Sequence, residues 1–220
     1  MHTGYRNPHH KYKMGSTELG VTTSEKDLGV WISDNMKSST HCAAAVKKAN
    51  RALGMIKRNF IYRDKNVILK LYKSLVRPHL DYCMPVWSPH LAKDINMVEK
   101  VQHRATKLIH NISHLPYEER IKKLNLTTLE ARRKRGDLIQ TYRIFSGIDN
   151  LDPDTLFRRP NCKKTRGHSL KLAKQRPRLD IRKHFFSHRV VKPWNKLPQS
   201  AVSAEDLLSF KIELSNNMGL

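Results

Sequence analysis

The sequence predicts a mainly α-helical protein with a small β element near its N-terminus. Apolar residues recur at alternating steps of three and four after residue 38, and only short β-prone pieces precede them. The chain has 220 residues, of which 39 % are hydrophobic and 28 % are charged, so it can bury a core. This composition excludes a collagen-like repeat, a low-complexity chain and a membrane-spanning protein.

Residues 1–35 are predicted to form short strands. The β-prone pieces lie at residues 12–14, 21–23 and 29–33, with turn-forming residues between them. Strands of this length cannot form a core by themselves. We therefore expect them to lie at the edge of a sheet whose remainder is elsewhere.

Residues 36–112 are predicted to form a three-helix bundle, because three amphipathic segments follow one another with short joints. The first has an apolar seam made of Val46, Ala49, Leu53, Ile56 and Phe60. The second begins after a potential cap, Asp64, and its apolar face is Ile68, Leu71, Tyr72, Leu75 and Val76. The seam of the third is Val98, Val101, Ala105, Leu108 and Ile112.

Residues 113–157 carry two further predicted helices between 116 and 147. Residues 127–130 match a capping box, and Gly147 suits the position that ends a helix. The second of these helices offers a core Ala131, Leu138, Tyr142 and Phe145. Residues 158–220 form a basic region, and its final helix is capped by residues 203–206 and carries Leu207, Phe210 and Leu214.

The charge balance indicates a polyanionic partner and disfavours a free metabolic enzyme. Lys and Arg number 42 against 19 Asp and Glu, which gives a net charge of +23. Residues 158–196 alone contain 14 Lys or Arg and one acidic residue, Asp180. Apolar residues are interspersed among them, so the segment is not a plain basic tail.

Several words along the chain match one family. They are residues 25–35 (Glu-Lys-Asp-Leu-Gly-Val-Trp-Ile-Ser-Asp-Asn), 49–54, 71–83, 87–89, 99–107, 117–120, 132–137, 165–169 and 182–186. In this order they resemble the reverse transcriptases of non-LTR (LINE-type) retrotransposons of the jockey and chicken-repeat kind. The resemblance covers nearly the whole chain, and the words are specific as a set.

The resemblance implies the C-terminal part of such a polymerase. Residues 1–35 then correspond to palm strands after the catalytic motif, 36–112 to the thumb and 113–220 to the family's basic C-terminal region. The family holds two divalent metals with an aromatic-x-Asp-Asp motif and an earlier Asp, and this sequence has no such motif. We therefore expect no polymerase activity and no cofactor for this chain alone, with Mg²⁺ needed only by the full-length polymerase.

RNA or DNA is the expected partner, bound through its phosphates. On the thumb helices, which in the family rest on the primer–template backbone, the candidates are Lys47, Lys48, Arg51, Lys57, Arg58, Arg104 and Lys107. In the basic region they are Lys163, Lys164, Arg166, Arg176, Arg178, Arg182 and Lys183. A run from Arg132 and Arg133 to Arg135 fits a nucleic-acid patch, a nuclear import signal or a solvated helix face.

Other functional patterns are weaker. Trp87 and Trp194 sit among prolines, where core packing is favoured over base stacking. A zinc site would have to use His41 with Cys42, or Cys162 with His168, without the paired spacing that structural zinc needs. The acidic residues of 149–154 suit turns better than a metal site, and nothing marks a nucleophile–base pair.

The N-terminus has no apolar signal region, and no apolar stretch is long enough to span a membrane. We expect an intracellular chain, nuclear or cytoplasmic, that is not secreted and has no membrane partner. The missing palm and fingers of the same polyprotein are a second potential partner. Two alternatives remain: a piece of a longer active polymerase, or a truncated relic without a function of its own.

Overall fold

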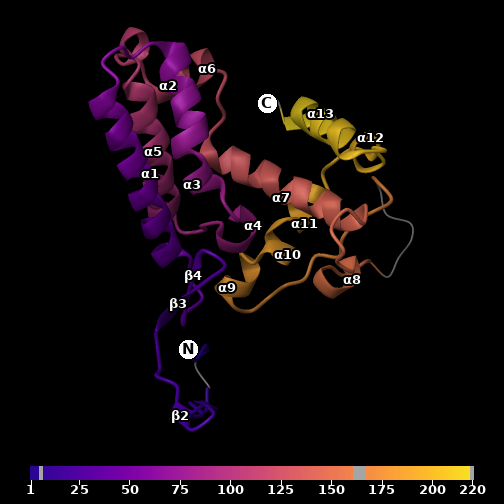
Figure 1. Ribbon diagram of the computed structural model, residues 1–220. Coiled ribbons are helices and arrows are strands. Elements are labelled where there is room, and N and C mark those ends of the chain that lie inside the picture. Colours follow the sequence, from indigo (N-terminus) through magenta and orange to yellow (C-terminus); the bar gives the residue numbers. More distant parts are fainter. Residues whose placement is uncertain (5–6, 161–166, 219–220) are drawn as a thin grey trace. The chain divides into compact units, whose positions relative to one another are not determined.

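The computed structural model describes residues 1–4, 7–160 and 167–218 (Figure 1). The chain forms two compact units. The first, called unit 1, comprises residues 1–83 and 87–114, and the second, called unit 2, comprises residues 84–86 and 115–220. The mainly α fold with a small β element is confirmed, because the described strands form only two-stranded sheets and helices follow them.

The strands of unit 1 pair as two antiparallel hairpins. Strands β1 (Lys13–Met14) and β2 (Thr17–Glu18) form the first, and β3 (Ser24–Asp27) and β4 (Val30–Ser33) form the second. The second hairpin turns on two residues with positive φ, Leu28 at 44° and Gly29 at 88°, as a tight turn of the primed type requires. Residues 21–23 precede β3 and are not a strand, which corrects that prediction.

Two helices form the centre of unit 1 and lie side by side (Figure 1). They are α1 (Ser39–Asn59) and α5 (Ala92–Lys107). Near their N-terminal ends Ser39 Oγ donates to Asp94 Oδ2 at 2.6 Å, and farther along Arg104 Nη1 donates to Asn50 Oδ1 at 3.2 Å. These two bonds have nearly the same sequence offset, so α1 and α5 run parallel, and α1 continues beyond the level at which α5 ends.

The predicted seams of both helices are largely buried. Ala49 and Val98 are fully buried, and the small side chain of Ala49 allows close packing. Phe60 is 39 % exposed because α1 ends at Asn59, which corrects its place in the seam. The third seam ends early as well, since residues 110–112 form a separate 3-10 turn, η2 (His110–Ile112).

A continuous run of short helices follows the predicted cap. The carboxylate of Asp64 accepts from Asn66 N at 2.7 Å, which confirms the cap of α2 (Lys65–Leu71). The run continues as η1 (Tyr72–Val76), a π-helix, and α3 (Pro78–Asp81), and α4 (Met84–Trp87) follows. The buried residues recur every four positions along this run: Ile68, Tyr72, Val76 and Leu80.

The π-helix explains why one predicted core residue is wrong. An ideal α-helix drifts from a strict four-residue repeat, whereas a π turn holds more residues and restores the alignment. Leu75 is thereby placed outside the seam and is 41 % exposed. Inside the seam, Tyr72 Oη donates to Gln102 Oε1 at 2.7 Å, a buried bond between η1 and α5.

Unit 2 is built on one long helix and a series of short ones. The long helix is α7 (Leu129–Phe145), and α6 (Tyr117–Lys123) precedes it. The shorter elements are α8 (Pro153–Leu156), α9 (Asp180–Lys183), α10 (Phe186–Arg189), α11 (Val191–Trp194) and α12 (Gln199–Val202), and α13 (Leu207–Met218) ends the series. Gly147, at φ 69°, ends α7 as predicted.

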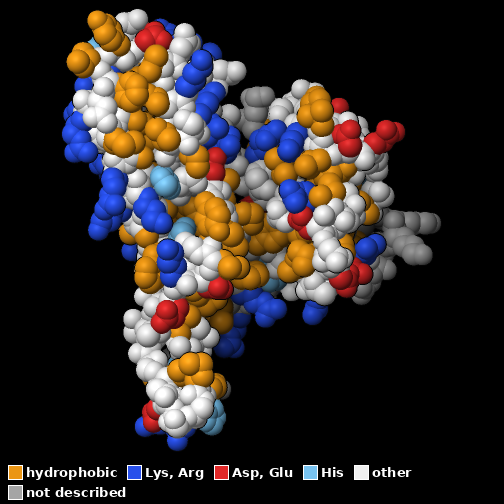
Figure 2. Space-filling view, viewed as in Figure 1, with side chains coloured by type: hydrophobic (Ala, Val, Ile, Leu, Met, Phe, Trp, Pro, Cys, Tyr) orange, Lys and Arg blue, Asp and Glu red, His pale blue; other side chains and the backbone are white. Residues whose placement is uncertain are grey.

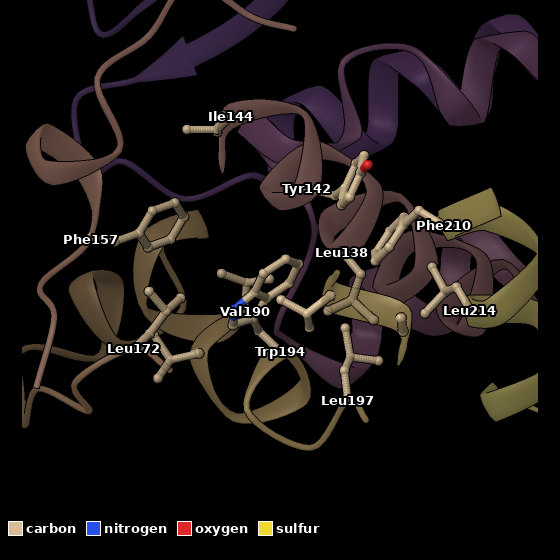
Figure 3. Close-up of a cluster of buried hydrophobic side chains, with 13 residues drawn as sticks. Leu138, Tyr142, Ile144, Phe157, Leu172, Val190, Trp194, Leu197, Phe210 and Leu214 are labelled. Atoms are coloured by element: carbon tan, nitrogen blue, oxygen red, sulfur yellow. The ribbon is translucent and has the colours of Figure 1, made fainter. Parts of the chain in front are cut away.

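The core of unit 2 gathers side chains from α7, α11 and α13 around Trp194 (Figure 3). The Tyr142 and Phe210 rings stack at 4.3 Å between centroids, and Trp194 and Phe210 are both fully buried. Trp194 Nε1 donates to Leu170 O at 2.8 Å. The described parts of the basic C-terminal region are therefore folded, around an apolar core that they share with α7.

Of the two predicted caps in unit 2, the one at residues 127–130 shifts by one position, and the one at residues 203–206 is confirmed. Thr128, not Thr127, caps α7, since Thr128 Oγ1 accepts from Ala131 N at 3.1 Å. This shift moves Glu130 out of the capping-box position, and Glu130 pairs instead with Lys134 at 2.7 Å. Asp206 caps α13 by accepting from Ser209 N at 2.7 Å. None of the helices among the described residues is both long and apolar enough to cross a membrane.

Candidate nucleic-acid interface

A depression of 540 Å³ lies between the C-terminal half of α1 and the last turn of α5 in unit 1. We call it the α1–α5 depression. Its lining consists of four cationic side chains, one amide and a short apolar floor: Lys57, Arg63, Arg104, Lys107, Asn50, Leu53, Gly54 and Leu108. No Asp or Glu is among these residues, so the charge of the lining is entirely positive.

The helical sequence explains how these cations come together. Lys57 follows the buried Leu53 by one turn and so flanks the apolar seam of α1. Arg104 and Lys107 are three residues apart and share the flank of α5 next to it. Because α1 and α5 run parallel, the C-terminal halves of the two helices bring Lys57, Arg104 and Lys107 into the lining of one depression. Arg63 comes from the joint between α1 and α2, and its Nη2 donates to Lys57 O at 3.5 Å.

The four cations have no acidic partner. Within the described part of the chain, none of Lys57, Arg63, Arg104 and Lys107 forms an ion pair, and Arg104 bonds only the neutral amide of Asn50. They do oppose the partial negative charge at the two helix C-termini, which stabilises the helices. That effect falls off within the last turn and leaves most of their charge for an anion. Guanidinium groups bind phosphate with two parallel hydrogen bonds, and lysine binds it as a point charge.

The other predicted cations of α1 lie outside this depression. Lys47, Arg51 and Arg58 recur at steps of four and seven, so they share one exposed outer face of the helix. Figure 2 shows Lys and Arg side chains gathered along the flank where α1 runs. Lys48 is exposed on another face, where it lines a smaller depression of 310 Å³ with His41. Burial, and secondly the charge of Lys48, lowers the pKa of His41.

The basic run on α7 is used largely within the protein. Arg133 is 3 % exposed and lies one turn before the buried Asp137, so the prediction that it contacts phosphate is wrong. Arg132 is half-buried, and Lys134 pairs with Glu130. Arg135 Nη2 donates to Lys211 O and to Ser215 Oγ, both at 3.3 Å.

The basic C-terminal segment divides into exposed and internal cations. Arg176, Arg178, Arg182 and Lys183 are exposed, as a phosphate contact requires. The predicted candidates Lys163, Lys164 and Arg166 lie outside the described residues. Two cations of the segment are internal: Lys171 donates from Nζ to Asn195 O, and Arg189 pairs with Asp137.

The Asp137–Arg189 pair joins α7 to α10 inside unit 2. Arg189 Nε and Nη2 donate to the two carboxylate oxygens of Asp137, each at 2.8 Å, and Nη2 also reaches Pro85 O at 2.7 Å. The side chains are 17 % and 9 % exposed. Burial raises the pKa of Asp137, and the hydrogen bonds from Arg189 limit that rise.

The two tryptophans belong to cores, as the core-packing interpretation predicts. Trp87 is 3 % exposed and donates from Nε1 to Tyr82 O at 2.6 Å, and Trp194 is fully buried. Neither ring is free to stack on a base.

The acidic cluster of the sequence is explained by local structure. Three hydrogen bonds from Arg143 and one from Gln140 hold the carboxylate of Asp149, and the bonds from Arg143 contribute most to lowering its pKa. Asp152 caps α8, and Asp154 pairs with Arg159 at 3.1 Å. In the described ranges no three His, Cys, Asp or Glu residues gather in a way that could hold a metal ion. Cys162 lies outside those ranges.

Comparisons of this chain with protein-family models, with curated proteins and with solved structures find no match.

Sequence reasoning found three of the four cations of the α1–α5 depression and missed Arg63. Lys57, Arg104 and Lys107 stand on helices whose periodicity was readable. Arg63 lies in the joint before Asp64, where no periodicity indicates which way a side chain points. Only the folded joint, which places Arg63 in the same lining as Arg104, reveals it. The bond from Arg104 to the amide of Asn50 also depends on how α1 and α5 pack.

Proposed function

We propose that this chain binds RNA or DNA through sequence-independent phosphate contacts, as the thumb and basic C-terminal part of a non-LTR retrotransposon reverse transcriptase. It has no catalysis of its own in this proposal. The observation that carries the proposal is the α1–α5 depression, in which four cations converge without an acid.

The four cations of the α1–α5 depression carry charge that no acidic residue of its lining compensates. A cation on an ordinary surface is usually solvated or paired with a carboxylate, and its placement then means little. Here Lys57, Arg63, Arg104 and Lys107 are held close together by two packed helices, so their mutual repulsion is built into unit 1. A phosphate group relieves that repulsion, and a phosphodiester backbone supplies successive phosphates to the outer face of α1 as well.

The resemblance supports the same partner independently. In the family the thumb rests on the primer–template backbone, and the words at residues 49–54 and 99–107 that carry the resemblance lie in α1 and α5. The net charge of +23 supplies long-range attraction for any polyanion. The depression adds what net charge alone does not, a place where contacts concentrate.

The test is equilibrium binding of the chain to fluorescently labelled single strands and duplexes of RNA and DNA over a salt series. The logarithm of the association constant is expected to fall linearly with the logarithm of the salt concentration, with a slope of about −0.9 per neutralised phosphate on duplex DNA. Absence of binding at low salt, or binding that salt does not weaken, would overturn the proposal. A primer-extension assay with the same preparation is expected to show no product.

A further inference from the structure

A second depression, in unit 2, combines an exposed aromatic ring with cations. It has a volume of 540 Å³ and is formed by α8, α9 and α10 together with residues on either side of them. We call it the Phe185 pocket. The residues of its lining that matter here are Arg158, Gln175, Ile181, Arg182, Phe185 and His188.

Phe185 differs from the other aromatic residues around it. Phe157 is 4 % exposed. Phe186 packs against the apolar core, and its ring centroid lies 5.9 Å from that of Phe157. Phe185 is 53 % exposed and is not part of that core. Its position is nevertheless fixed, because Phe185 O accepts from His188 N at 3.0 Å and from Arg189 N at 2.9 Å. Single exposed apolar side chains are common on protein surfaces, but this ring lies in a depression whose lining also holds Arg158 and Arg182.

The two cations of the pocket, Arg158 and Arg182, are placed so that they can bind a phosphate. Arg158 and Arg182 are exposed and form no ion pair within the described ranges. The acid of the lining, Asp154, is already neutralised by Arg159 at 3.1 Å. Burial, followed by the charge of Arg182, lowers the pKa of His188 and so favours its neutral ring, which has one donor and one acceptor nitrogen.

We infer that the Phe185 pocket binds an unpaired base of single-stranded RNA or DNA. The ring of Phe185 stacks on the base, and Arg158 and Arg182 contact the flanking phosphates. Aromatic stacking with tracking of the backbone by cations is the general means of holding single strands. A duplex is excluded from this pocket because each of its bases is covered by its neighbours on both faces. Gln175 and His188 supply neutral polar groups for the edge of the base.

This inference rests on the proposed function, since it assumes a nucleic-acid partner, and it adds a site that binds an unpaired base by stacking. The test compares two single strands of equal length and equal phosphate count, one with bases and one abasic, each measured by fluorescence anisotropy against the full chain. The wild-type chain is expected to bind the strand with bases at least about fivefold more tightly. RNA and DNA versions of the strands show which sugar the pocket prefers.

Three substitutions at one position separate stacking from apolar contact. Phe185→Ala is expected to reduce the ratio of the two affinities by about fivefold or more, leaving the binding of the abasic strand unchanged. Phe185→Trp keeps the ratio, because indole stacks at least as well. Phe185→Leu retains an apolar side chain but no π face, and is expected to behave like Phe185→Ala. Leu208→Ala, an exposed apolar residue of α13 at 67 %, is the control and leaves the ratio unchanged.

The outcomes are distinguishable from failure of the proposed function. If Phe185→Ala leaves the ratio unaltered, no base stacks on Phe185 and the inference is wrong. If Phe185→Leu keeps the full ratio, the site makes an apolar contact, as with a peptide side chain, and the inference is wrong as well. The proposed function fails separately, when the abasic strand shows no salt-dependent binding to the wild-type chain.

Discussion

The buried pair of Asp137 and Arg189 gives the sharpest stability prediction for unit 2. Replacing Arg189 with Met keeps an unbranched apolar stem and removes the guanidinium group with its charge. It leaves the Asp137 carboxylate, 9 % exposed, without its two bonds at 2.8 Å, and it takes a donor from Pro85 O and from His184 O. Breaking a buried pair by removing one partner costs about 3–5 kcal/mol. Because Arg189 is itself 17 % exposed, we expect a loss near the lower end, about 3 kcal/mol.

The pH dependence of this loss follows from the same burial. Asp137 already has a raised pKa in the folded protein, and removing Arg189 takes away the hydrogen bonds that limit the rise. A carboxyl group with a raised folded pKa favours the folded state below its unfolded pKa, about 3.9, and loses that contribution as the pH rises through the folded value. The Arg189→Met protein is therefore expected to be less destabilised at pH 5 than at pH 8.

Urea unfolding at both pH values, followed by circular dichroism, measures these changes. Arg178→Met removes an exposed cation of the same basic segment and is expected to change stability by less than about 0.5 kcal/mol. Asp137→Leu combined with Arg189→Met removes both charges, and is expected to recover most of the loss. Equal effects of Arg189→Met and Arg178→Met would refute the assignment of a structural role to Arg189.

Three further predictions concern stability. Trp194→Ala, which empties the centre of the unit 2 core, is expected to cost about 3–5 kcal/mol, whereas Leu208→Ala on the exposed face of α13 is nearly neutral, as urea titrations will show. Buried His168 bonds Trp194 O from Nε2 at 3.0 Å, and burial lowers its pKa, so its contribution is present above the unfolded value of about 6.5 and lost as the pH falls. The melting temperature of the His168→Phe protein should therefore fall less than that of the wild type between pH 7.5 and pH 5.5; an equal fall would contradict this. Thr128→Ala is expected to cost about 1 kcal/mol by removing the cap of α7, and Thr128→Ser should restore most of it, measured by thermal unfolding.

Periodicity predicted the long helices because the pattern of apolar residues within each segment determines which face of the helix is buried. The seams of α1, α5 and α7 each repeat over several turns, and the caps at Asp64 and Gly147 follow from single-residue chemistry. The prediction that Leu75 belongs to the apolar face failed because a π-helix shifts the register, and no residue type indicates that shift. The capping box failed by one position because two threonines stand side by side and either could cap.

The candidate sites were predictable only in part, since pairing between distant residues is not visible in a sequence. Arg189 counts as one of many cations in the basic segment until the fold brings it to Asp137, 52 residues earlier. Arg133 appears in a basic run, yet its position on α7 places it beside that same acid. The Phe185 pocket was not predicted from the sequence. The word that contains Phe185 and Phe186 gives no hint of which ring is buried, and only the packing of Phe186 on Phe157 decides it.

The central claim is that phosphate contacts concentrate in the α1–α5 depression, beyond the general attraction of a basic protein. Two double variants with the same change in charge test it most directly. Arg104→Gln/Lys107→Gln removes two cations from the lining, and Lys93→Gln/Lys100→Gln removes two exposed cations from elsewhere on α5. The measurement is the salt dependence of binding to duplex DNA. The slope is that of the logarithm of the association constant against the logarithm of the salt concentration. The account predicts that the first pair of substitutions makes this slope less steep by about 1.8, at about 0.9 for each lost contact, and that the second pair leaves it nearly unchanged. Equal reductions by both pairs would show that only net charge matters and would contradict the account.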